Sequence, residues 1–275
     1  MSGGEDIRAS TGVDGLDKML KGGLIPGRPY IVSGTTGSGK TTLGVQFLQQ
    51  GVRQGERALM IAIDEPPAEI RENVRYLGWD VGKIRILDVH PTGKAYNKRV
   101  SVVEVAAQRA VGSLREARTD ASTEAMKQAS PELSVQSLQL MLRQELQEVE
   151  YSRLVLDSIT TLKRMAGDED TDDGIMSLIR FLSEANVTSM VITDLPDSTR
   201  VLPEIFLSRG EIRLHKQLAS SKIERYVTIE NIRGSPHDTQ PRYFRLDKGG
   251  MTVDSRKKVS KSIIGMLQGL PAHTK

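Results

Sequence analysis

The chain has 275 residues, of which 27% are charged and 38% are hydrophobic, a balance that excludes wholesale disorder and suffices for one large α/β domain or two small ones. It contains no cysteine, which excludes a disulfide scaffold, a thiolate-ligated metal site and a cysteine nucleophile, and which fits a cytoplasmic protein. The 38 basic and 35 acidic residues give a net charge of +3, too small an excess to indicate nucleic-acid binding by itself.

The first predicted elements enclose a glycine-rich loop. Residues 30–32 predict a strand and residues 40–52 a helix, and between them the segment GTTGSGKT at 34–41 matches the phosphate-binding loop pattern at every fixed position. Glycines let successive N–H groups point at phosphates, Lys40 supplies a charge for the β- and γ-phosphates, and the Thr41 hydroxyl suits Mg²⁺. We therefore expect nucleotide contacts from Gly34, Thr35, Thr36, Gly37, Ser38, Gly39, Lys40, Thr41 and Thr42.

Two acidic residues follow the next predicted strand. The apolar run at 58–63 is typical of a strand buried on both faces, and a helix is predicted over 68–77. Asp64 and Glu65 lie between them, at the carboxyl end of the strand, where α/β sheets bind ligands. We expect Glu65 to act as the base that activates water, with Asp64 assisting. The alternative is that Glu65 only caps the following helix.

The alternation then continues with strands at 84–87, 154–156 and 187–193 and helices at 133–149 and 172–184. Asp157 ends the middle strand, and beside a phosphate-binding loop we expect it to hold Mg²⁺, although such a residue can also be a helix N-cap. After about residue 209, alternating segments at 211–215, 225–230, 242–246 and 250–253 predict antiparallel strands added to the edge of a mainly parallel sheet.

These motifs together resemble the KaiC-like branch of the RecA superfamily of ATPases, over about 10–253 apart from 93–132. The resemblance rests on STGVDGLD at 10–17, GGLIPG at 22–27, the phosphate-binding loop, Asp64-Glu65 and IRGS at 232–235. It implies a RecA-like P-loop fold, ATP and Mg²⁺ as ligands, and a homohexameric ring with nucleotide between subunits. It also implies that Arg233 reaches the neighbour's γ-phosphate and that His237 lies on the nucleotide side; from the residues alone, Arg233 is part of a solvated turn.

The chain departs from the family pattern in two ways that bear on activity. Asn231 takes a nucleotide-side position where the family often has lysine, and the loss of a cation there predicts slower hydrolysis. The chain has one such domain, whereas some family members have two domains and a Ser–Thr phosphoacceptor pair, so we expect no autophosphorylation of that type.

We expect one ATPase domain over 1–254, with a helical insertion at 93–132, and a basic tail over 255–275. Both segments contain more basic than acidic residues, which suits a solvated face and a subunit-docking tail, or phosphate backbones. Two functions remain open: a nucleotide-driven regulator of an unidentified protein partner, or a RecA/RadA-paralogue-like accessory ATPase of DNA recombination or repair. No apolar run is long enough to span a bilayer, and the acidic start does not resemble a secretory signal.

Overall fold

The structure is a computed structural model that describes residues 7–89, 134–165, 171–195, 202–219 and 222–259. The helix expected within the insertion at 93–132 and the part of the tail after 259 lie outside these residues.

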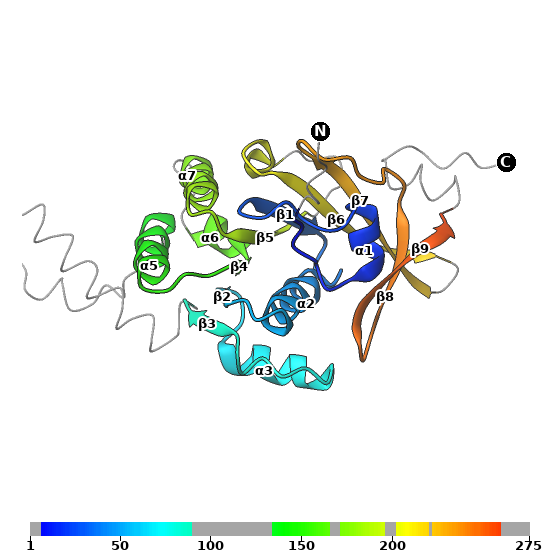
Figure 1. Ribbon diagram of the computed structural model, residues 1–275, viewed down its shortest axis with the longest axis horizontal. Helices are drawn as coiled ribbons and strands as arrows, with labels where there is room; N and C mark the ends of the chain where they lie inside the picture. The colour runs from blue at the N-terminus through cyan, green and yellow to red at the C-terminus, as the bar shows by residue number, and fades with distance from the viewer. Residues whose placement is uncertain (1–6, 90–133, 166–170, 196–201, 220–221, 260–275) are drawn as a thin grey trace, which may run out of the picture.

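One mixed sheet forms the centre of the described structure, with strand order β3-β2-β4-β5-β1-β6-β7-β8-β9 (Figure 1). Neighbouring strands in the part of this order from β3 to β6, which includes β2, β4, β5 and β1, pair in parallel. Neighbouring strands from β6 to β9 pair antiparallel. The strands are β1 (Pro29–Gly34), β2 (Ala58–Ala62), β3 (Arg85–Asp88), β4 (Arg153–Asp157), β5 (Thr188–Asp194), β6 (Gly210–Ala219), β7 (Lys222–Ile232), β8 (Arg242–Asp247) and β9 (Gly250–Lys258). This arrangement confirms the predicted RecA-like α/β fold class.

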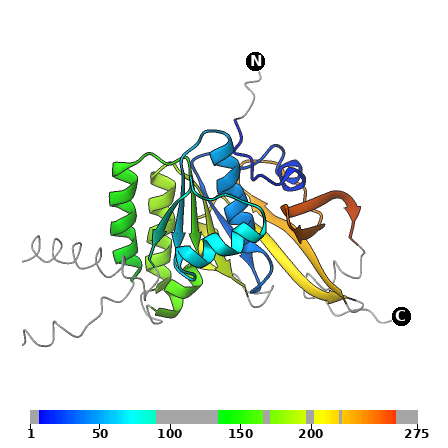
Figure 2. The same cartoon turned by 90° about the horizontal axis from the view of Figure 1, so that it is seen from below.

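Helices cover both faces of the parallel part of the sheet (Figure 2). On one face lies α2 (Lys40–Arg53), with α1 (Asp14–Met19) against β9 and α3 (Pro67–Tyr76) against β3. On the other face lie α5 (Val135–Glu148), α6 (Ile159–Met165) and α7 (Thr171–Glu184). Successive strand residues point to opposite faces, so Val32 packs in the core under α2 while Ile31 packs in the core under α5 to α7. A sheet covered in this way requires the continuous apolar strands that the sequence contains.

The parallel register gathers several strand ends at one edge of the sheet. Gly34 pairs with Asp194, and Ala62 pairs with Asp157. The carboxyl ends of β1, β2, β4 and β5 therefore meet at this edge, as expected for the ligand-binding side of such a sheet.

All the regular elements predicted within the described residues are present, with ends shifted by a few residues. The sequence analysis missed α1, α6 and the 3₁₀ turn η2 (Pro203–Phe206), which are too short for a helical period to show. Strands β6 and β7 are longer than predicted, and β9 runs to Lys258, past residue 255, where we expected the tail to begin. The Lys257 ammonium lies 4.2 Å from the centre of the Tyr243 ring on β8, which holds this basic end on the sheet.

Within the described ranges, no helix is both long and apolar enough to cross a membrane.

Candidate nucleotide-binding site

The glycine-rich loop between β1 and α2 is pressed against the antiparallel part of the sheet. A Cβ added at Gly34 would lie 2.3 Å from the carbonyl oxygen of Leu214 on β6, and one added at Gly39 would lie 2.9 Å from Leu246 on β8. Gly37 and Gly39 also have φ values of 74° and 105°, which favour glycine. The loop therefore needs glycines at these positions, and β6 and β8 fix its outer side.

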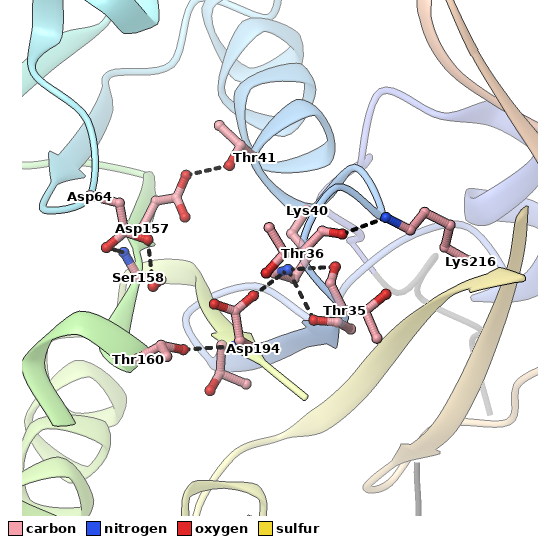
Figure 3. A network of polar contacts seen from close by, with 12 residues as sticks. Thr35, Thr36, Lys40, Thr41, Asp64, Asp157, Ser158, Thr160, Asp194 and Lys216 are labelled. Atoms are coloured by element: carbon pink, nitrogen blue, oxygen red, sulfur yellow. Dashed lines mark hydrogen bonds and ion pairs between the residues drawn. The ribbon is translucent and has the colours of Figure 1, made fainter. Parts of the chain in front are cut away.

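Lys40 opens α2 and turns its side chain back into the loop. Its ammonium donates to the carbonyl oxygens of Gly34 (2.9 Å) and Thr35 (3.0 Å) and pairs with the Asp194 carboxylate at 2.8 Å (Figure 3). Lys216 on β6 donates to the Thr36 carbonyl at 2.8 Å from the other side. Two ammonium groups thus converge on one short loop, an arrangement suited to an anionic ligand.

The proposed metal ligands meet although they lie far apart in the chain. The Thr41 hydroxyl donates to the Asp157 carboxylate at 2.7 Å, across 116 positions of sequence. Burial, together with the nearby Asp64 carboxylate, raises the pKa of Asp157 to about 7 in spite of this hydrogen bond. A divalent cation would offset the cost of charging Asp157. Mg²⁺ commonly takes one or two protein oxygens together with water and phosphate, so this pair fits it.

The two acids after β2 have different surroundings. The Asp64 carboxylate accepts from the Ser158 hydroxyl at 2.8 Å and from the Ser158 amide at 3.3 Å. Glu65 is half-buried and accepts from the Asn73 side chain on α3 at 3.1 Å. Asp64 is therefore engaged in fixing the chain beside Asp157, whereas Glu65 has a side-chain contact that a small rotation can break.

Two buried hydroxyls in the loop indicate that it is shaped for a ligand. Within the described part of the chain, the hydroxyl oxygens of Thr35 and Ser38 are buried and have no hydrogen-bond partner. Buried polar groups are nearly always paired in folded proteins. Phosphate oxygens are suitable acceptors for both hydroxyls, so the residues present fit a nucleotide together with Mg²⁺. Thr42 lies in the first turn of α2.

The late residues implied by the family resemblance lie elsewhere. Gly210 pairs with Tyr30 at the start of β1 and with Ile232 at the end of β7, whereas the loop begins at Gly34, about 13 Å further along β1. Arg233 is exposed and donates to the Phe206 carbonyl at 2.6 Å. One chain therefore does not bring Arg233 to its own loop.

The other two residues of this late group have local contacts. The Asn231 side chain accepts from the Glu211 amide at 3.0 Å, at the irregularity between β6 and β7. His237 is half-buried, with its ring nitrogen 3.4 Å from the Ser235 carbonyl oxygen. The structure thus gathers Lys40 and Thr41 with the three acids but leaves Asn231, Arg233 and His237 apart from them.

Asp194, Thr160 and Lys216 were missed by the sequence analysis. Asp194 ends an apolar strand just as Asp157 does, and this shared position was the available signal. Its amide donates to the Thr160 hydroxyl of α6 at 2.7 Å. Lys216 carried no local signal, because only the pairing of β6 with β1 brings it to the loop.

Known proteins resemble this chain over most of its length. A family model described as "ATPase: KaiC" matches residues 9–258. A UPF0273 protein of Pyrococcus furiosus is 25% identical over 94% of this chain and 98% of its own length. The circadian clock protein KaiC2 of Synechocystis is 27% identical over 90% of this chain, which spans 40% of that relative's length. A crystal structure of a KaiC-like protein from Pyrococcus horikoshii superposes with a TM-score of 0.70, covering 90% of this chain and 99% of the other, at 24% identity, a likeness of fold.

Proposed function

This chain belongs to the KaiC family of ATPases, and from that premise we propose that it binds ATP with Mg²⁺ at the glycine-rich loop and hydrolyses it slowly. The observation that carries the proposal is the contact of the Thr41 hydroxyl with the Asp157 carboxylate at 2.7 Å, directly beside the loop that holds Lys40. A phosphate-binding loop without this pair would support binding alone; with the pair, the site has the means to hold the metal that phosphoryl transfer requires.

Each residue has a role that its surroundings support. The loop amides and Lys40 bind the phosphates, and Thr41 and Asp157 hold Mg²⁺, which neutralises phosphate charge when it is bound. Glu65 accepts the proton of the attacking water, because within the described residues its carboxylate has only the exposed Asn73 contact to give up. Asp64 acts as a positioning residue through Ser158.

The site is completed by a second copy of the chain in a homohexameric ring. Arg233 supports this part of the proposal, since it is exposed and its own loop lies at the opposite end of β1. In a head-to-tail ring the same arginine faces the neighbour's nucleotide, where it stabilises transition-state charge. Asn231 brings no cation to that position, which is why the turnover is slow.

Binding and turnover are tested separately. Titration calorimetry with Mg-ATP should show binding to the wild type and none to Lys40→Ala. Glu65→Gln should bind ATP normally but hydrolyse it at least 100-fold more slowly, since a general base contributes about 10²–10⁴-fold. Glu184→Gln is the matched control. This exposed glutamate ends α7 just before the amino end of β5, at the opposite end of the sheet from the glycine-rich loop. Normal hydrolysis by Glu65→Gln would remove it as the base.

Subunit mixing tests the ring. Lys40→Ala and Arg233→Ala chains should each be inactive alone. In mixed rings about a quarter of the interfaces combine an intact Lys40 with an intact Arg233, so mixing should restore activity. A mixture as inactive as its components would contradict a site shared between subunits.

The ring's role is proposed to be nucleotide-driven regulation of a protein partner. One relative is named as a circadian clock protein, although this chain spans less than half of it. The competing function, a DNA recombination accessory ATPase, makes a different prediction: ATP turnover would rise with added DNA and the stimulation would fall steeply with salt. If added DNA changes neither ATP turnover nor ring assembly, the result favours regulation of a protein partner.

A further inference from the structure

Asp194 lies at the centre of the site and has no part in the function proposed so far. It ends β5, paired with Gly34 at the start of the loop, and its carboxylate lies 2.8 Å from the Lys40 ammonium. Lys40 is 8% exposed and Asp194 is 26% exposed. Figure 3 shows the two side chains pointing toward each other, Lys40 from the start of α2 and Asp194 from the end of β5.

The contacts of Lys40 set up a competition. An ammonium group has three N–H donors, and here three oxygens surround it, from Gly34, Thr35 and Asp194. To contact a phosphate, Lys40 has to give up at least one of them. Asp194 is the charged member of the three, so it is the strongest competitor for the ammonium. Once released, its carboxylate lies beside an incoming polyanion and repels it.

The main chain of Asp194 is held independently of this ion pair. Its amide donates to the Thr160 hydroxyl at 2.7 Å, and the next amide, of Leu195, donates to the Gly34 carbonyl at 3.1 Å. Replacing the carboxylate by an amide of the same shape therefore removes the charge while the backbone contacts keep the end of β5 in place.

We propose that Asp194 is a counter-ion that competes with the nucleotide phosphates for Lys40 and thereby weakens nucleotide binding, more for ATP than for ADP. The proposal rests on the proposed function, since it assumes that the loop binds ATP. The preference follows from charge: the carboxylate opposes the ligand in proportion to the negative charge that the ligand brings, and ATP carries the additional phosphate.

The test is calorimetric titration of Asp194→Asn with Mg-ATP and with Mg-ADP, next to the wild type. We expect Asp194→Asn to bind Mg-ATP about tenfold more tightly, and Mg-ADP by a smaller factor. Glu184→Gln, which removes one negative charge at the other end of the sheet, should leave both affinities unchanged. A residue that only shaped the site would weaken binding when replaced, so the direction of the change is decisive.

Two further measurements keep the outcome interpretable. Circular dichroism and thermal melting establish that Asp194→Asn is folded, and Asp194→Ser supplies a second neutral variant, which should also bind Mg-ATP more tightly than the wild type. If the wild type binds Mg-ATP and both folded variants bind it equally or more weakly, the role of Asp194 is overturned and the proposed function stands. If the wild type shows no binding, the proposed function itself fails.

Discussion

Replacing Asp157 by Asn should stabilise the nucleotide-free protein at pH 8 while destroying its response to Mg²⁺. Burial raises the pKa of Asp157 from an ordinary value of 3.8 to about 7, so the folded protein resists charging this group. Below pH 4 the carboxyl is protonated in both the folded and the unfolded states and has no effect on stability. Between pH 4 and 7 only the unfolded state releases the proton, so stability falls as pH rises, and above pH 7 the full penalty is present.

The size of the effect follows from the shift in pKa. The rise of the pKa of Asp157 from 3.8 to about 7 corresponds to a penalty on the order of a few kcal/mol at pH 8. Asparagine has the shape of the protonated acid, and its carbonyl can still accept from the Thr41 hydroxyl. Asp157→Asn should therefore melt roughly 5–10 °C above the wild type at pH 8, and the difference should vanish near pH 4.

The assay is thermal unfolding of both proteins, without nucleotide or metal, across pH 4 to 8, with Glu184→Gln as the control for a lost negative charge. Calorimetry with ATP then completes the comparison: Mg²⁺ should strengthen ATP binding to the wild type and have no effect on Asp157→Asn. The prediction would be wrong if Asp157→Asn had a melting temperature at or below that of the wild type at pH 8, or if the two melting temperatures differed by the same amount at every pH. Either result would show that ionising the Asp157 carboxyl does not destabilise the folded protein.

Three more changes test other parts of the structure. Gly39→Ala should abolish Mg-ATP binding in a folded protein, since Gly39 has a φ of 105°, whereas Gly55→Ala, at a φ of 81° with open space around it, should bind normally by calorimetry. Arg153 is completely buried and bonded to Glu56, so Arg153→Ala should lose about 3 kcal/mol of unfolding free energy in urea; an unchanged midpoint would contradict this. Burial lowers the pKa of His215 to about 4, so the folded state resists protonation of its ring. The contribution of His215 to stability is therefore lost as pH falls from about 6.5 to 4, so His215→Gln should gain stability relative to the wild type over this range in pH-dependent urea titrations.

The sequence by itself determined the features that depend on neighbouring residues. The glycine-rich loop with Lys40 and Thr41 is continuous in the chain, and its chemistry follows from spacing alone. Uninterrupted apolar strands, alternating with helices, likewise indicated a covered parallel sheet, because burial on both faces leaves no room for polar residues. Asp157 was expected at the site because it ends such a strand.

Only the tertiary structure decided which strand ends lie next to one another. Asp194 and Lys216 reach the loop through the pairing of β5 and β6 with β1. The position of Asp194 at the end of an apolar strand was a local signal, whereas nothing local in the sequence distinguishes Lys216. Asp64 and Glu65 differ because the Asp64 carboxylate is hydrogen-bonded to Ser158, whereas the Glu65 carboxylate is available to act as a base. Ser158 lies 94 positions away from Asp64 in the sequence. Arg233 lies away from the glycine-rich loop of its own chain, because the pairing of β6 with β1 and β7 places it near the opposite end of β1. Contacts between distant segments depend on topology, and the residue pattern of a single strand carries no record of its neighbours.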